Sequence, residues 1–219
     1  MTEPGSGGEA GPDTPHGGFP ATRNWREGRN ATTEGGPEYG RMIDSLREFL
    51  DLVAGAKLDS AAAAALAGQI EALLPHLASR QVREREQIFA HRIDLPGRGQ
   101  TMAPRFLVTD GDDTSVAGRV TFGRYFLGGN GAVHGGAIPL LFDEVLGRLA
   151  NTGGRKPSRT AYLHVNFRSI APIGRDLDVR ARIVKIDGRK RFITAELCDG
   201  DTLCADAEGL FVELKPGQP

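Results

Sequence analysis

The last third of the chain alternates apolar and polar residues, and this pattern constrains the fold more than any other feature. Four segments have this period of two, namely residues 160–168, 177–186, 191–198 and 203–214. The pairs Asp187-Gly188 and Asp199-Gly200 separate the last three segments, and such pairs favour tight hairpin turns. Strands joined by tight turns run antiparallel. The sequence therefore predicts an antiparallel β-meander at the end of the chain.

The first of these segments is expected to have one apolar face. Its two faces are Ala161, Leu163, Val165 and Phe167 against Thr160, Tyr162, His164, Asn166 and Arg168. A similar alternation begins at Thr101 and includes Phe106, Val108, Val116, Gly118, Val120 and Phe122. It predicts a further hairpin around residues 111–113.

One helix is predicted between these strands, from about His134 to Asn151. It follows the glycine-rich residues 128–131, and Gly153-Gly154 ends it. Pro139 falls in its first turn, where a missing backbone N–H is least costly. One side carries a core stripe of Ile138, Leu141, Phe142, Val145 and Leu149, and the far side carries Leu140, Asp143 and Gly147. Apolar residues on both sides predict burial on both, by a sheet on one side and a partner subunit on the other.

The part before this pattern divides into two regions. Residues 1–37 are rich in Gly, Pro, Thr and Glu, and we expect a disordered tail there. Residues 38–93 are expected to form a helical extension of two helices. Asp59 is a good N-cap for the second helix, and Pro75 should end or kink it. The extension could serve dimer packing or cover a pocket of the main domain, residues 94–219.

Overall charge and composition exclude some classes of partner. The 219 residues carry 27 basic and 28 acidic side chains, so no general field draws the chain to nucleic acid or to an anionic membrane. We find no signal-peptide pattern in the first 40 residues and expect no segment that approaches a membrane helix. These observations predict a cytoplasmic protein. Cys198 and Cys204 could face each other across a hairpin, but two reduced thiols are the expectation in a cytosolic chain.

The segment from His134 to Asp143, HGGAIPLLFD, is a recognisable motif. It resembles the H-G-G-x6-D motif of hotdog-fold thioesterases of the phenylacetic-acid-degradation type, a group that includes human acyl-CoA thioesterases. The similarity continues through residues 160–174 to Phe211 and spans about residues 101–214. It implies an α+β hotdog fold, with an antiparallel sheet wrapped around a long helix, and hydrolysis of an acyl-CoA thioester. The residues before 100 lie outside it.

Gly135 and Asp143 are the main catalytic candidates. Glycines at a helix N-terminus let a ligand approach the free backbone N–H groups at the positive end of the helix dipole. The resemblance assigns the oxyanion contact to the Gly135 N–H; the plainer interpretation is that both glycines only permit a tight turn. Asp143 lies off the core stripe, where an Asp is usually solvated, yet the resemblance makes it the general base or the nucleophile. Glu144 points about 100° away and is the weaker candidate.

Three further residues take their roles from the resemblance. Thr160 matches a Ser or Thr that reaches the site from the opposed subunit and orients water, although a strand Thr is often only a β-former. Asn130 matches a polar residue of the preceding loop, with a spacing that differs from some members. His134 either polarises the pocket or fixes the loop through a backbone bond.

Coenzyme A is expected to meet a basic stretch of the sheet. Between residues 168 and 191 there are eight basic and three acidic side chains, and Arg forks suit phosphates. Arg168 is the main candidate, because the family often has a basic residue there. Gly136, Arg189 and Lys190 are also assigned to this site. The alternative interpretation is that these basic residues only lie on the solvent-exposed face of an antiparallel sheet and bind no ligand.

Acyl-CoA is therefore the expected substrate, with no cofactor and no metal. We expect a homodimer or a dimer of dimers, with each site assembled from two subunits. A hydratase or dehydratase would need a second His, which the sequence does not place. A non-catalytic acyl-CoA sensor or binding module would use the same cleft without turnover. A buried carboxylate is costly in a mere binding pocket, and this favours the enzyme.

Overall fold

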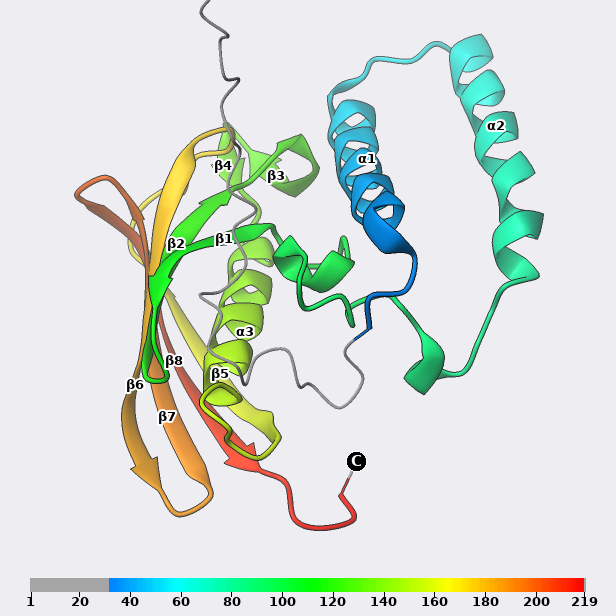
Figure 1. Ribbon diagram of the computed structural model, residues 1–219. Coiled ribbons are helices and arrows are strands. Elements are labelled where there is room, and N and C mark those ends of the chain that lie inside the picture. The colour runs from blue at the N-terminus through cyan, green and yellow to red at the C-terminus, as the bar shows by residue number, and fades with distance from the viewer. Residues whose placement is uncertain (1–31, 219) are drawn as a thin grey trace, which may run out of the picture.

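The computed structural model describes residues 32–218, and its centre is a curved sheet around one helix (Figure 1). The six-stranded sheet is antiparallel throughout, in the order β1-β2-β6-β7-β8-β5. Its strands are β1 (Phe106–Gly111), β2 (Ser115–Thr121), β5 (Ser158–Phe167), β6 (Asp176–Asp187), β7 (Lys190–Asp199) and β8 (Thr202–Glu213). The helix is α3 (Ala137–Ala150), and the sheet wraps around it. The predicted α+β hotdog architecture is confirmed.

The core lies between α3 and the concave face of the sheet. All five residues of the predicted stripe are buried, and Leu141, Phe142 and Val145 are fully enclosed. The alternation along β2 is also confirmed, because Val116, Gly118 and Val120 are buried while their neighbours are not. The far side of α3 remains open in the single chain, with Leu140 39% exposed.

Strand β5 departs from simple alternation. Its register with β8 shifts between Thr160 and Tyr162, which makes Ala161 the extra residue of a β-bulge. Leu163 and Val165 pack against the core, but Ala161 and Phe167 are exposed. The predicted single apolar face is therefore wrong at the start of the strand, because an extra residue reverses the side on which the preceding residues point. Phe167 keeps the alternation with Leu163 and Val165, and its exposed ring lies near Gly135.

The N-terminal extension forms two helices, α1 (Gly36–Gly55) and α2 (Ser60–Ala78), followed by short 3-10 turns at Glu84–Glu86 and Pro96–Gly99. Asp59 caps α2 as predicted, by accepting a hydrogen bond of 2.8 Å from the Ala62 N–H. Pro75 does not end this helix, which continues to Ala78. Of the predicted tail, residues 1–31 lie outside the described residues.

The two helices of the extension differ in how they contact the main domain. Ile43 of α1 is buried, and the Asp51 carboxylate accepts a hydrogen bond of 2.9 Å from the Tyr125 N–H of the turn Arg124–Phe126. No residue of α2 is buried (Figure 1). By length and composition alone α2 is a candidate membrane span, which corrects the expectation that no segment approaches one.

Candidate active site

A short loop before α3 holds the His-Gly-Gly motif. It consists of two small strands, β3 (Leu127–Gly129) and β4 (Ala132–Val133), and it is held on two sides. The His134 N–H donates to the Phe126 carbonyl at 2.7 Å, and the Val133 N–H donates to the Ala171 carbonyl at 2.8 Å. These bonds tie the loop both to the turn under α1 and to the segment after β5.

Asn130 lies at the tip of this loop, in the left-handed conformation with φ 50°. Asn tolerates that conformation better than most residues, and this is a local reason for Asn in the turn. Its side chain is exposed, and among the described residues no hydrogen bond joins it to His134 or Asp143. The structure therefore does not bring Asn130 into contact with the other candidates.

The amides at the start of α3 are not equivalent. The Gly136 N–H donates to His134 Nδ1 at 3.0 Å, and the Ala137 N–H donates to the His134 carbonyl at 2.8 Å. The Gly135 N–H has no acceptor within residues 32–218. The His134 ring thus fixes the loop, and it leaves one exposed amide, that of Gly135, available to a ligand.

Space around Gly135 is also open. A Cβ placed there would meet only the Phe167 ring, at an ordinary contact distance of 3.8 Å, and the backbone φ is not in the left-handed region. The fold itself therefore does not require glycine at this position. Approach of a ligand to the backbone is a better reason for it than a tight turn.

Asp143 is exposed on the open side of α3, as its position off the core stripe predicts. One carboxylate oxygen accepts a hydrogen bond of 2.9 Å from the Thr160 hydroxyl, and the other oxygen faces no donor among the described residues. Thr160 belongs to the same chain, whereas the resemblance implied a residue from the opposed subunit. The bulge at Ala161 allows this contact, because it puts Thr160 on the same side of β5 as Leu163.

Glu144 has a different environment from its neighbour. It is buried, and its two oxygens accept hydrogen bonds of 2.9 and 2.7 Å from Arg98. Arg148 lies 3.8 Å from the same carboxylate, and burial lowers the pKa of Arg148 to about 10. Glu144 is therefore held in a structural ion pair. Sequence reasoning missed Arg98, because it lies in an irregular segment 46 residues away with no periodic signal.

The basic residues assigned to coenzyme A do not form one group. Arg168 follows β5 and is exposed, and it pairs with Asp206 on the neighbouring strand. This guanidinium holds the pKa of Asp206 below its usual value. Arg191 is buried and caps α3, since it donates to the Ala150 carbonyl at 2.8 Å.

Arg189 and Lys190 lie at the opposite end of the sheet from Arg168. Lys190 pairs with Val212 of β8. The next residue of β8, Glu213, pairs with Ser158, which is the first residue of β5. The ten residues of β5 separate the two groups by roughly 30 Å at about 3.3 Å per residue. Within one chain the structure therefore does not bring Arg189 and Lys190 together with Arg168.

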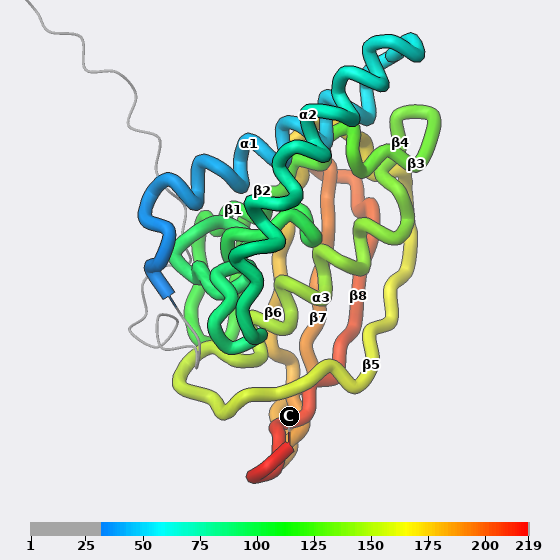
Figure 2. Tube along the Cα trace, turned by 90° about the vertical axis from the view of Figure 1, so that its right-hand side faces the viewer, coloured from blue at the N-terminus to red at the C-terminus, as the bar shows by residue number. Residues whose placement is uncertain are grey.

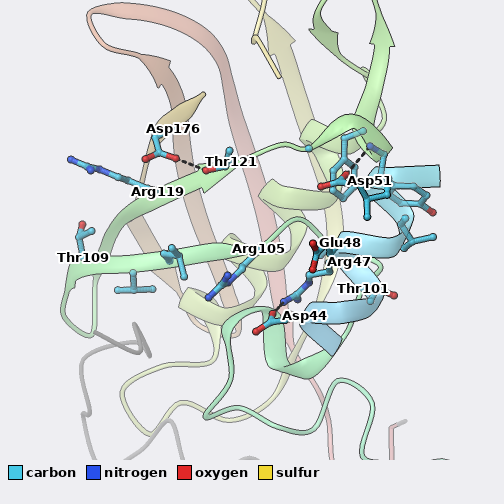
Figure 3. Close-up of a pocket in the computed structure, with 18 residues that line it drawn as sticks. Asp44, Arg47, Glu48, Asp51, Thr101, Arg105, Thr109, Arg119, Thr121 and Asp176 are labelled. Atoms are coloured by element: carbon cyan, nitrogen blue, oxygen red, sulfur yellow. Dashed lines mark hydrogen bonds and ion pairs between the residues drawn. The ribbon is translucent and has the colours of Figure 1, made fainter. Parts of the chain in front are cut away.

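A large cavity lies elsewhere, between α1 and the edge of the sheet (Figure 3). Its volume is about 870 Å³, and its walls include Leu50 of α1, Ala103, Leu107 and Val108 near β1, and Phe126. Arg47 and Arg105 approach each other from its two walls, and burial lowers the pKa of Arg47. None of the nine site residues predicted from sequence lines this cavity.

Comparisons with known proteins bear on the fold and the family. Residues 130–205 match the family model described as the Thioesterase superfamily. Acyl-coenzyme A thioesterase THEM4 of Bos taurus is 35% identical over 96 residues, which cover 43% of this chain and 39% of that protein. THEM4 of Mus musculus is 34% identical over 99 residues, covering 44% and 42%. The chain thus matches only about two fifths of the length of these relatives.

A solved structure shows similarity over a longer stretch. The crystal structure of protein RHA08564, a thioesterase superfamily protein, has a TM-score of 0.68 and 26% identity. The alignment covers 80% of this chain and 94% of that one, which is more than the main domain alone can supply. Part of the extension therefore has a counterpart there. By its family match over residues 130–205 and by its fold, this chain carries a hotdog domain similar to those of the thioesterase superfamily.

Proposed function

We propose that the protein hydrolyses the thioester of an acyl-CoA to a free acid and coenzyme A. The observation that carries the proposal is that α3 presents two suitable groups, roughly 12 Å apart along the helix at about 1.5 Å per residue, so that a site would take one group from each of two chains. The first is the Gly135 N–H, which has no acceptor among the described residues, and the second is the exposed Asp143 carboxylate held by Thr160. The THEM4 relatives, which are named acyl-coenzyme A thioesterases, support the same reaction.

Each group has a defined task in this reaction. The Gly135 N–H donates to the thioester carbonyl oxygen as negative charge develops there, assisted by the positive end of the α3 dipole. Asp143 either removes a proton from the attacking water or attacks the carbonyl carbon itself and is later released by water. Thr160 orients the carboxylate, and His134 holds the loop so that the Gly135 amide stays free.

The proposed active form is at least a homodimer. In the single chain the open side of α3 exposes Leu140, and the edge strand β5 exposes Phe167. A second copy placed against α3 and β5 would cover both and exclude water from the site. Acyl-CoA would then lie with its acyl group between the subunits and its phosphates toward Arg168.

The experiment is a hydrolysis assay with a series of acyl-CoA esters and a thiol-trapping dye, applied to the full chain. Asp143→Asn should lower kcat at least ~10²-fold, because a general base or nucleophile is lost. Its matched control is Asp201→Asn, which makes the same chemical change in the exposed turn between β7 and β8 and should leave kcat unchanged.

Binding of acyl-CoA should survive in Asp143→Asn, and calorimetric titration measures it. If Asp143→Asn hydrolyses acyl-CoA as fast as the wild type, Asp143 is not the catalytic carboxylate. If the wild type binds every ester tested and hydrolyses none, the protein is a binding module and the proposed reaction is wrong.

A further inference from the structure

Helix α2 carries a regular apolar seam that nothing in the single chain covers. Leu66, Ile70, Leu73 and Leu77 follow each other at steps of four, three and four residues. This is the spacing of the a and d positions of a heptad repeat, and it places all four side chains on one narrow stripe of the helix. Ile70, Leu73 and Leu77 are 39%, 59% and 58% exposed.

Helix α1 has a second seam with the same spacing. Met42, Leu46, Phe49 and Val53 again follow at steps of four, three and four. This seam lies about 110° around the helix from the face that includes Ile43 and Arg47, taking 3.6 residues per turn. That second face contacts the main domain, where Ile43 is buried and Arg47 donates to the Pro96 carbonyl at 3.3 Å. The contact with the domain therefore leaves Met42, Leu46 and Val53 of the α1 seam exposed, while Phe49 is half-buried.

The two seams do not cover each other within one chain. Met42, Leu46 and Val53 remain 42–44% exposed, although α1 and α2 are joined by only four residues, 56–59. Figures 1 and 2 show α1 and α2 as a helical hairpin on the side of α3 away from the sheet. An apolar stripe of this length on a water-facing helix is typical of a helix that packs against other helices.

A membrane is the less favourable cover, in spite of the composition of α2. Both ends of α2 return to the same domain: α1 is tied to it through Asp51, and the segment after α2 is tied back to α1. In that segment Arg92 donates to the carbonyls of Glu34 and Gly36 at 3.1 and 2.8 Å. A helix whose two ends are held on one side cannot cross a bilayer without breaking these contacts.

We propose that the α1–α2 hairpin pairs with the same hairpin of a second copy to form an antiparallel four-helix bundle. Two helices with matched seams are half of such a bundle, and an identical copy supplies the other half by two-fold symmetry. The flanking positions of the α2 seam, Ala67, Gln69, Leu74 and His76, carry no carboxylate, ammonium or guanidinium group. Glu71, the one Asp, Glu, Lys or Arg residue of α2, lies about 130° away from the seam.

The available area is large enough for a stable interface. Helices of 20 and 19 residues are about 28–30 Å long, with a diameter of about 10 Å. Covering half the girth of both would bury roughly 900 Å² of each copy. A stable protein interface buries about 800 Å² per partner.

The bundle is a different interface from the one proposed for β5. The hairpin lies beyond α3, whereas β5 is an edge strand of the sheet (Figure 2). We assign the two interfaces to different copies, so that an assembly with both contains four chains. The bundle itself does not depend on the proposed hydrolysis.

The test is the mass of the full-length chain in solution, measured by sedimentation or by light scattering after gel filtration. Leu73→Glu puts a charge in the α2 seam, and Ala72→Glu puts the same charge about 130° away as a matched control. We expect four chains for the wild type and Ala72→Glu, and two for Leu73→Glu. Leu46→Glu in the α1 seam should behave like Leu73→Glu.

The seam variants should still fold, because no residue of α2 is buried in one chain. Circular dichroism and retained thioester hydrolysis check this. An unchanged mass in both seam variants overturns the bundle. The bundle is also overturned if the seam variants lose binding to vesicles of phosphatidylcholine and phosphatidylglycerol without any change of mass. Lipid would then be what covers the seam. If the wild type contains two chains and the seam variants contain one, the bundle is supported and the proposed β5 interface is contradicted.

Discussion

Asp143 and Glu144 are adjacent carboxylates with opposite surroundings, because the helix turns about 100° from one to the next. Asp143 faces the open side of α3 and contacts a single hydroxyl, that of Thr160. Glu144 faces the segment Pro96–Gly99, where Arg98 engages both of its oxygens. A free carboxylate suits catalysis, and a fully paired one suits structure.

Loss of the Glu144 charge should lower stability and leave chemistry intact. Glu144→Gln leaves Arg98 and the buried Arg148 facing a neutral amide, and we expect a cost of roughly 2–3 kcal/mol in the free energy of unfolding. Denaturant unfolding measures this change, while kcat at low temperature should stay near that of the wild type. A fully stable but inactive Glu144→Gln protein would show that the catalytic carboxylate is Glu144.

The hydroxyl of Thr160 should matter through the position of Asp143. Thr160→Val removes a hydrogen bond worth about 1 kcal/mol, so kcat should fall roughly fivefold with little change in KM. Thr160→Ser keeps the hydroxyl and should restore most of the rate. Equal activity in the Val and Ser variants would mean that Thr160 only fills space.

At the scale of the element, the bulge in β5 decides which side chains meet α3. Simple alternation would place Thr160 on the face opposite Leu163, because the two residues differ by an odd number. The extra residue Ala161 reverses this and brings Thr160 to Asp143. Thus a single inserted residue in one strand completes the contact on the candidate catalytic carboxylate.

The two ends of the sheet should respond differently to loss of a positive charge. Arg168→Ala should raise KM for acyl-CoA at least about tenfold and leave kcat nearly unchanged, since the nucleotide lies remote from the reacting bond. Arg189→Ala, at the other end of the strands, should change neither constant. The measurement compares acyl-CoA with an acyl-N-acetylcysteamine ester, which lacks the phosphates.

A substrate-independent defect would contradict this assignment. If Arg168→Ala impairs both esters equally, Arg168 supports the fold through its pair with Asp206. Salt offers a second readout, because ions screen exposed charges. The wild type should lose affinity for acyl-CoA with rising salt more steeply than Arg168→Ala does.

At the scale of the whole molecule, the extension is part of the main body on one side only. Helix α1 forms a wall of the 870 Å³ cavity and contacts the turn that holds the His134 loop. Helix α2 contributes no buried residue. The extension therefore covers a pocket, which is one of the two roles considered for it from the sequence. Its exposed seams are the basis of the proposed bundle.

Removal of residues 38–93 should destabilise the domain and cause aggregation. It takes away one wall of the cavity and uncovers apolar side chains such as Phe126 and Val108. Thermal unfolding and light scattering measure both effects. Removal of residues 1–31 is the control; their composition predicts a nearly unchanged melting temperature, and a large loss there would contradict it.

The sequence alone was sufficient for the order and type of most elements. The four strands predicted after α3 agree with the structure to within about two residues and α3 to within about three, and the core stripe of α3 is buried. These features depend on local periodicity and turn chemistry, which short stretches of sequence contain. The resemblance of the H-G-G-x6-D segment likewise selected Gly135 and Asp143 as catalytic candidates, and their roles stay a prediction.

Only the tertiary structure decided which distant residues meet. Arg98 pairs with Glu144 across 46 positions, Arg168 and Lys190 lie at opposite ends of the strands, and the Ala161 bulge turns Thr160 toward Asp143. Periodicity carries no information about such contacts, because register and loop path depend on packing across the whole domain. For the same reason composition marked α2 as apolar, but only the fold showed that both of its ends return to one domain and that its seam is left uncovered.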